Sequence, residues 1–289
     1  MDLCNISDIR ALLQRHGFRF SKGLGQNFLC DASVPEGIAQ RAGLDKDSCV
    51  LEVGPGIGCL TEQLCMRARK VVSVELDVRL APVLRETMAA QSNFTLVQGD
   101  ILKTDIAQLC RREFGQCRAV ACANLPYYIT SPAIAALLES RCFDAVTVMV
   151  QREVARRICA RPGTPDYGAF SVFVQWHAQP QTVLEVGRES FVPSPNVDSS
   201  VVRLDVRKAP PAEVCSERLF FRVVRAAFAQ RRKTLLNCLA SAFSGECSKT
   251  DMQQCIGACG LDPGVRGETL SIDQFARLSN RIGTFTGNI

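Results

Sequence analysis

The feature that most constrains this chain is an alternation of short apolar runs with stretches of helical periodicity. Between residues 49 and 151 the apolar runs are rich in aliphatic and β-branched side chains, and helix-like segments separate most of them. In order, the runs are CVLEV, KVVSVELD, FTLVQGD, CRAVACANLPYY and FDAVTVMVQ. Strands that alternate with helices at this spacing predict an α/β domain with a mostly parallel sheet.

The remainder of the chain changes character near residue 208. Three further runs, SVFVQWHA, TVLEV and SVVRLDV, are predicted as strands that complete the same sheet. The proline-containing segment KAPPAE then has the composition of a linker, and the pattern beyond it is helical to the end. We therefore expect a sheet domain with an N-terminal lead-in over residues 1–207 and a small helical domain over residues 208–289.

Charge and hydropathy narrow the class of protein. The net charge is +5, and residues 208–289 hold a surplus of four basic side chains, which suggests an anionic partner for the helical domain. Apolar runs are too short for a membrane span, and the first residues lack the basic start and apolar run of a secretory signal. We expect a cytoplasmic protein that does not contact membranes.

Cysteine is abundant but carries no motif. Fifteen cysteines are scattered without a CxxC pair, and only two histidines, His16 and His177, could assist in binding zinc. An odd number of cysteines indicates free thiols in a reducing compartment, where most serve as small core residues. We expect no metal site.

The segment LEVGPGIG places Gly54, Gly56 and Gly58 between the first strand and a helix. Glycines there let the backbone approach a ligand, although a tight turn without a ligand is the alternative. Glu75 ends the second strand, where an acid reaches ribose hydroxyls, and Asp100 follows the third, where it could accept from an adenine amino group. Each acid alone is more often a cap or a loop charge. Together, without a phosphate-binding lysine, they favour a cationic adenosine such as S-adenosylmethionine over a dinucleotide.

The segment ANLPYYIT follows the fourth strand and contains no conventional acid, base or nucleophile. Pro126 interrupts the strand and leaves the carbonyl of Leu125 without its usual hydrogen bond in the sheet. This carbonyl and the side-chain amide oxygen of Asn124 could accept from the two N–H bonds of an adenine amine. Tyr127 offers a face on which a base can stack, a contact of about 1–3 kcal/mol. Catalysis by positioning needs no general base. An Asn–Pro turn with buried tyrosines is the alternative.

A stretch of unmixed positive charge occupies the start of the helical domain. Six basic residues and no acidic one lie between residues 218 and 233. They include Arg218 and the candidates for phosphate contacts, Arg222, Arg225, Arg231, Arg232 and Lys233. The segment QREVARR could extend this footprint. Contacts of this kind position RNA without reading its sequence.

Eight blocks in order make the chain resemble the ribosomal RNA adenine dimethyltransferase family, closest to its small-subunit (16S) branch. The blocks are GQNFL, LEVGPGIGCLT, VELD, GDIL, NLPYYIT, QREVARRICARPGTPDYGAFSV, FVPSPNVDSSVVRL and AFAQRRKTLLN. The resemblance covers residues 20–237 and continues weakly to the end. It implies a Rossmann-like methyltransferase sheet, a helical C-terminal domain, and two methylations of each of two adjacent adenines near the 3′ end of 16S rRNA.

The resemblance also assigns roles to individual residues. It implies cofactor contacts at Asn27, Leu29, Gly54, Glu75 and Asp100, with Asn124 between cofactor and target base. It places Phe191 on the target adenine opposite Tyr127, although a core aromatic is the simpler interpretation of Phe191 alone. Leu236 stands where many relatives have a basic residue, which puts one RNA contact in doubt.

Several alternatives stay open. The chain could methylate large-subunit rRNA and give macrolide resistance, or serve chiefly as a non-catalytic ribosome assembly factor. A DNA adenine methyltransferase is disfavoured because Leu125 interrupts the expected PPY motif, and a nicotinamide oxidoreductase is a distant possibility. The leading hypothesis is a monomeric enzyme that acts on 16S rRNA within the small ribosomal subunit or its precursor.

Overall fold

The computed structural model describes residues 1–18 and 27–287, and its contacts divide the chain into two compact units. The sheet unit comprises Met1–Ala155 and Ala178–Val206, and the helical unit comprises Arg156–His177 and Arg207–Ile289. The segment Arg156–His177 thus groups with the C-terminal helices, whereas the sequence placed it with the sheet. A functional division at residue 208 stays a prediction.

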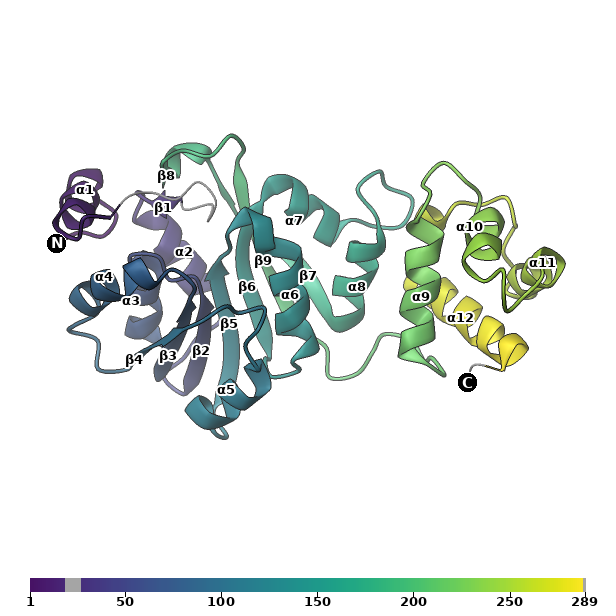
Figure 1. Cartoon of the computed structure of the whole chain (residues 1–289), viewed down its shortest axis with the longest axis horizontal. Coiled ribbons are helices and arrows are strands. Elements are labelled where there is room, and N and C mark those ends of the chain that lie inside the picture. The colour runs from purple at the N-terminus through teal and green to yellow at the C-terminus, as the bar shows by residue number, and fades with distance from the viewer. Residues whose placement is uncertain (19–26, 288–289) are drawn as a thin grey trace. The chain divides into compact units, whose positions relative to one another are not determined.

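The sheet unit is built on seven strands in the order β4-β3-β2-β5-β6-β9-β7 (Figure 1). The first five in this order pair in parallel, and β9 pairs antiparallel with both β6 and β7. The strands are β2 (Ser48–Val53), β3 (Lys70–Glu75), β4 (Phe94–Gln98), β5 (Arg118–Asn124), β6 (Ala145–Gln151), β7 (Ala178–Val186) and β9 (Ser199–Val206). The predicted mostly parallel α/β sheet is confirmed.

Helices connect the parallel strands and cover the sheet, which explains why β2 is buried at all six positions. They are α1 (Ile6–Arg15), α2 (Ser33–Arg41), α3 (Cys59–Arg67), α4 (Ala81–Thr87), α5 (Ile106–Phe114) and α6 (Thr130–Glu139), with the short 3-10 turns η2 (Val78–Leu80), η3 (Tyr127–Ile129) and η4 (Arg188–Ser190). Helix α7 (Arg152–Cys159) runs from the sheet unit into the helical unit.

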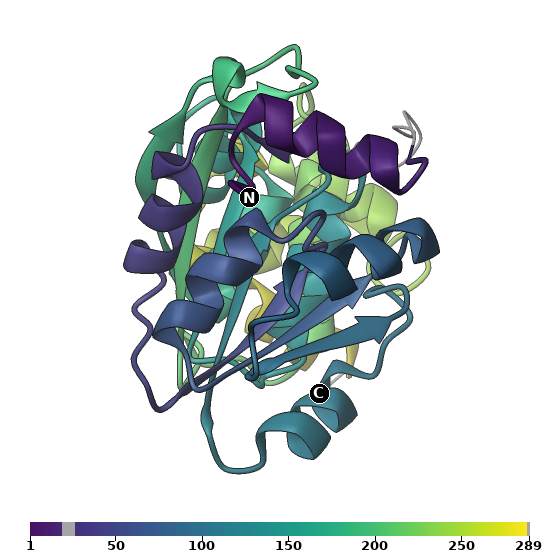
Figure 2. The ribbon, with the colours of Figure 1, turned by 90° about the vertical axis from the view of Figure 1, so that its left-hand side faces the viewer.

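Helix α1 is tied to the sheet unit by a cluster of charged side chains. Arg15 and His16 near its end both reach Glu86 on α4, with N–O distances of 2.5 and 2.6 Å. Figure 2 shows α1, in dark purple, lying along the same side of the unit as α4. Its apolar residues Ile9, Leu12 and Leu13 are buried in the core of this unit.

Two features of the sheet position a ligand site. The chain runs from β2 outward to β3 and β4, then returns to β5 on the other side of β2, so the crossover direction reverses between β2 and β5. Ligands of open α/β sheets bind at such a reversal, beyond the carboxyl ends of the strands. A second, two-stranded sheet pairs β1 (Phe28–Leu29) with β8 (Phe191–Val192), with Leu29 opposite Phe191.

The helical unit packs around an aromatic and aliphatic core. Its helices are α8 (Ala169–His177), α9 (Glu217–Phe228), α10 (Leu235–Ala242), α11 (Lys249–Ala258) and α12 (Ile272–Thr286), with the turn η5 (Gly267–Thr269). Trp176 on α8 stacks on Phe220 of α9 with ring centroids 4.2 Å apart. Side-chain caps at Ser216, Thr234, Ser248 and Ser271 begin the four long C-terminal helices.

The expectation of a strand at SVFVQWHA is wrong, because these residues form α8. The segment is rich in β-branched and aromatic side chains, which favour strands in a half-buried setting. Here Val172, Val174 and Trp176 are all buried, and the segment joins the core of the helical unit. Tertiary packing outweighs the local preference. Within the described residues, no helix is long and apolar enough to cross a membrane.

Candidate active site

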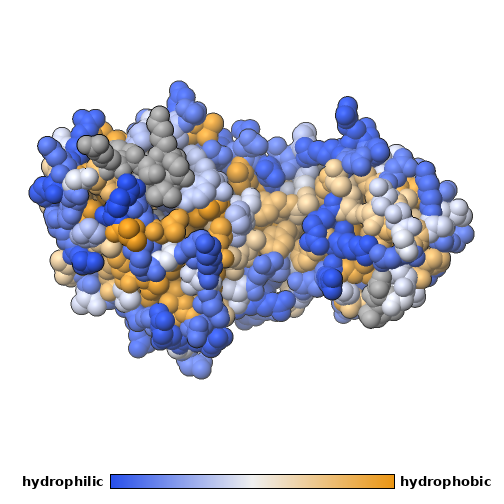
Figure 3. All heavy atoms as spheres, viewed as in Figure 1, coloured by the Kyte–Doolittle hydropathy of each residue, from blue (hydrophilic) through white to orange (hydrophobic). Residues whose placement is uncertain are grey.

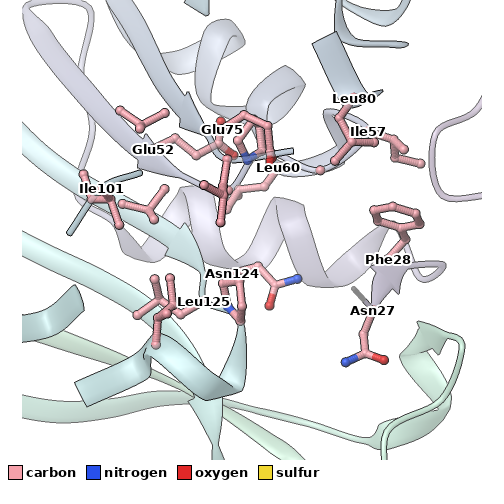
Figure 4. A pocket seen from close by; sticks show the side chains of 18 of the residues that line it. Asn27, Phe28, Glu52, Ile57, Leu60, Glu75, Leu80, Ile101, Asn124 and Leu125 are labelled. Atoms are coloured by element: carbon pink, nitrogen blue, oxygen red, sulfur yellow. The ribbon is translucent and has the colours of Figure 1, made fainter. Parts of the chain in front are cut away.

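A cleft opens at the carboxyl ends of β2, β3, β4 and β5, at the reversal described above. The cavity has a volume of ≈ 200 Å³ and is open to solvent on one side. Each residue predicted for cofactor or catalysis lines it: Asn27, Leu29, Gly54, Glu75, Asp100, Asn124, Leu125, Tyr127 and Phe191. Figure 4 shows Glu75 across the cavity from Asn124, with Asn27 and Phe28 at one side.

The glycine loop between β2 and α3 forms one wall of the cleft. Gly54, Gly56 and Gly58 all have positive φ, at 68°, 61° and 101°. A Cβ on Gly56 would lie 3.2 Å from the ring of Phe28, and a Cβ on Gly58 would lie 2.7 Å from Met88 Cε. The positive φ favours glycine at all three positions, and crowding adds to this preference at Gly56 and Gly58. The loop leads into the N-terminus of α3, where the first peptide N–H groups of a helix have no partner within the helix.

The two acids predicted from spacing reach the cleft from neighbouring strands. Glu75 is the last residue of β3 and is mostly buried, and its Oε1 accepts from the backbone N–H of Asp77 at 2.8 Å. Burial raises the pKa of Glu75, and hydrogen bonds from the backbone of Asp77 and Gly56 partly oppose this. Asp100 follows β4, and its Oδ1 accepts from the N–H of Leu102 at 3.0 Å. Each acid thus also bonds its own loop.

A third carboxyl group, on Glu52, was given no role by the sequence reasoning. It lies on β2, is only 1% exposed, and lines the cleft. Its Oε2 accepts from Thr61 Oγ1 at 2.7 Å and from Ser73 Oγ at 2.6 Å. Burial raises the pKa of Glu52 to about 7, the two hydroxyl donors oppose this shift, and the charge of Glu75 adds to it. The available signal was an acid within an apolar strand, directly before the glycine loop.

Asn124 and Leu125 present acceptors without competing partners. Asn124 ends β5, and the N–H of Leu125 donates to the Met149 carbonyl on β6 at 3.2 Å. In the part of the chain that the structure describes, no group donates to the Leu125 carbonyl or bonds the Asn124 amide. Pro126 then turns the chain, and its carbonyl accepts from the N–H of Ile129 at 3.1 Å. Two oxygen acceptors are thus available to a ligand at this edge.

Aromatic rings come to the same cleft from two segments. Tyr127, on η3, is partly buried, and its hydroxyl lies 2.9 Å from Ser199 Oγ on β9. Phe191, on β8, also lines the cleft but is 3% exposed and belongs to the core of the sheet unit. The structure therefore brings both predicted rings to the cleft, and burial also agrees with a core role for Phe191. Tyr128, the next residue on η3, lines the cleft as well.

The charge of the cleft is one-sided. Glu52, Glu75 and Asp100 line it, and no described lysine, arginine or histidine does. Phosphate ligands need basic side chains or many backbone donors, whereas a cationic ligand gains from nearby carboxylates. The space-filling view shows apolar surface on the visible face of the sheet unit, edged by hydrophilic residues (Figure 3). The cleft therefore fits an adenosine that carries positive charge.

The predicted RNA contacts lie on the helical unit and differ in availability. Arg222 Nη1 bonds Glu246 at 3.0 Å, and its guanidinium lies 4.1 Å from the centroid of the Phe243 ring. Arg231 donates to the carbonyls of Pro165 and Tyr167 at 2.9 and 3.1 Å. These two cations brace the unit itself. The others, Arg225, Arg232 and Lys233, are exposed, and their side chains have no hydrogen-bond partner among the described residues.

Comparison with known proteins decides the family. The family model for ribosomal RNA adenine dimethylase matches residues 17–283. The chain belongs to the ribosomal RNA adenine dimethylase family. Members of this family dimethylate adenines of ribosomal RNA with methyl groups from S-adenosylmethionine, so the chain is an rRNA adenine dimethyltransferase.

Curated relatives and solved structures agree with this assignment. The chain is 45% identical over 283 residues to the ribosomal RNA small subunit methyltransferase A of Shouchella clausii, covering 97% of this chain and 96% of the relative. A relative of the same name from Geobacillus thermodenitrificans is 45% identical over 284 residues, or 97% of each chain.

Two crystal structures resemble most of the chain. One is of a dimethyladenosine transferase from Plasmodium falciparum, with a TM-score of 0.72, 26% identity, and coverage of 86% of this chain and 95% of that one. The other is of the 23S rRNA methyltransferase ErmE, with a TM-score of 0.67, 29% identity, and coverage of 89% of this chain and 99% of that one. The greater identity to small-subunit enzymes favours that branch.

Proposed function

We propose that the protein acts as a monomer on 16S rRNA, within the small ribosomal subunit or its precursor. It transfers methyl groups from S-adenosylmethionine to the exocyclic amines of two adjacent adenosines near the 3′ end, and so forms dimethyladenosines during subunit maturation. The observation that carries the proposal is a cleft lined by three carboxyl groups and no described basic side chain, with two oxygen acceptors at its edge that have no partner among the described residues.

The cofactor site consists of residues that the fold gathers from five segments. The proposed contacts are Asn27, Leu29, Gly54, Glu75, Asp100 and Asn124. Glu75 accepts from the ribose diol, Asp100 accepts from the adenine amino group, and the glycine loop allows the backbone to approach closely. When bound, S-adenosylmethionine supplies an electrophilic methyl group on a positively charged sulfur.

The acceptor amine is oriented by Asn124 and Leu125. Their oxygens accept from its two N–H bonds, which directs the nitrogen lone pair away from the protein acceptors and toward the methyl group. Tyr127 and Phe191 flank the target base, and the bond to Ser199 fixes the Tyr127 ring. The amine gains positive charge when it is methylated, so its proton becomes acidic and leaves afterwards. Positioning and electrostatics supply the catalysis.

The exposed cations Arg225, Arg232 and Lys233 supply phosphate contacts from the helical unit. Replacing all three by glutamine should weaken RNA binding regardless of RNA sequence. The slope of the logarithm of the association constant against the logarithm of the salt concentration should become less steep by about 2–3. Arg277, an exposed arginine on α12, provides the control substitution to glutamine. An unchanged slope in the triple variant would show that these side chains do not meet phosphates.

The central experiment incubates the protein with labelled S-adenosylmethionine and small subunits that lack adenine dimethylation. Nuclease digestion and mass spectrometry should locate dimethyladenosine at the adjacent 3′-end pair. Label confined to large-subunit RNA would assign the protein to the resistance branch. Absence of label together with tight particle binding would leave an assembly role alone.

Asn124→Ala separates chemistry from binding. Since the Asn124 amide has no described protein partner, its loss should leave folding and particle binding intact. The rate of methylation should fall by at least about 100-fold, which is the effect typical of removing an oriented dipole from an active site. The measurements are particle binding by filtration and methyl incorporation under single-turnover conditions. Retained methylation would exclude the proposed role of Asn124.

A further inference from the structure

Tyr128 is an aromatic residue at the cleft that the proposed acceptor site does not use. It lines the cleft and is 52% exposed, and within the described residues its hydroxyl has no hydrogen-bond partner. Leu76 and Leu102, which are 46% and 41% exposed, line the same cleft. Exposed apolar groups gathered at one site commonly become covered when a ligand binds.

The backbone directs Tyr127 and Tyr128 to different partners. Both lie on the 3-10 turn η3, which is braced because the Pro126 carbonyl accepts from the N–H of Ile129 at 3.1 Å and from Thr130 Oγ1 at 3.3 Å. A 3-10 turn has three residues per turn, so consecutive side chains project about 120° apart. The two side chains therefore leave the turn in different directions.

The order of strands places the partner of Tyr127 and the two acids on different sides of β5. Tyr127 is bonded to Ser199 on β9, which lies beyond β6 on one side of β5. Glu75 and Asp100 follow β3 and β4, on the other side of β5. Burial raises the pKa of the Tyr128 phenol, and the negative charges of Asp100 and Glu75 add to the rise, which places Tyr128 within their electrostatic reach. The phenol therefore stays protonated and can donate a hydrogen bond.

We propose that Tyr128 belongs to the cofactor subsite, where its ring packs against the adenosine half of S-adenosylmethionine between Glu75 and Asp100. This inference rests on the proposed assignment of those two acids to ribose and adenine. The ring covers the cofactor on the side that the cleft leaves open, and the hydroxyl donates toward Asp100. Tyr127 serves the target base, and Tyr128 serves the methyl donor.

The test is calorimetric binding of S-adenosylhomocysteine, and separately of adenosine, to the full chain without RNA. Tyr128→Ala should weaken the binding of both ligands by the same factor, about ten-fold, because the lost contact is a stack on the adenosine that the two ligands have in common. Tyr128→Phe keeps the ring and should stay within about three-fold of the wild type. Phe285→Ala, at an exposed ring on α12, is the matched control and should not change either affinity.

Two results would overturn the inference. If Tyr128→Ala binds S-adenosylhomocysteine as the wild type does while its KM for RNA rises, the ring serves the RNA. If the variant has a lower affinity for S-adenosylhomocysteine but the wild-type affinity for adenosine, the ring contacts the homocysteine half of the ligand. Failure of the proposed function is distinguishable, since the wild-type protein itself would then bind neither ligand.

Discussion

Replacing Glu52 by glutamine tests how the sheet unit holds an acid beside the glycine loop. The substitution preserves size and keeps an oxygen acceptor but removes the ability to ionise. Glu52 is 1% exposed and is surrounded by the hydroxyls of Thr61 and Ser73, both of which can rotate to suit an amide. The variant should therefore fold and differ from the wild type chiefly in its response to pH.

The magnitude follows from the pKa of this carboxyl. Burial raises the pKa of Glu52 from 4.5 to about 7, a difference worth about 3 kcal/mol at ~1.4 kcal/mol per pH unit. The folded state binds the proton more tightly than the unfolded state does. The cost of ionisation is therefore absent below pH 4.5, grows between pH 4.5 and 7, and is complete above pH 7. Glutamine carries no such cost.

Urea unfolding at pH 5 and pH 8 measures this cost. The free energy of unfolding of Glu52→Gln minus that of the wild type should be larger, in favour of the folded variant, at pH 8 than at pH 5 by about 2–3 kcal/mol. Glu153→Gln, at an exposed acid on α7, is the control and should show little change between the two pH values. An equal difference between Glu52→Gln and wild type at both pH values would refute the reasoning.

Three further substitutions test the packing. Gly58→Ala should cost about 1–3 kcal/mol in thermal unfolding, because φ is 101° and the new Cβ would approach Met88; an unchanged melting temperature would contradict the strain argument. Trp176→Ala should cost about 3–5 kcal/mol in urea unfolding followed by circular dichroism, since the ring is fully buried against Phe220; a loss below 1 kcal/mol would show that this core is not closely packed. Ser271→Ala removes the cap of α12 and should cost about 1 kcal/mol by the same assay; no loss would mean that water replaces the cap.

Several parts of the site could be predicted from the sequence, because each depends only on residues that are close together in the chain. Glycine spacing after a strand, an acid at a strand end, and an amide before a proline are local patterns, and parallel strands place their carboxyl ends at one edge of a sheet. Glu75, Asp100 and Asn124 line one cleft, and their proposed roles stay a prediction. The sequence does not decide whether the segment around Gln26 closes over the cofactor, and Gln26 lies outside the described residues.

Other parts required the fold. Whether Arg222 and Arg231 are free for RNA depends on Glu246 and on two backbone carbonyls far away in the chain. The raised pKa of Glu52 depends on burial, which its apolar segment signals, and on the charge of Glu75 on a neighbouring strand, which its own segment does not encode. Periodicity also failed at α8, since a segment buried on most sides loses the alternation that separates helix from strand.

The sequence by itself determined the parallel α/β order, the glycine loop and the acceptor segment, because period, turn chemistry and strand ends are short-range properties. Only the tertiary structure decided that Leu29 pairs with Phe191, that α8 is a helix, and that the Tyr127 hydroxyl meets Ser199 on β9. These outcomes depend on contacts between distant segments, where burial and packing outweigh local preference.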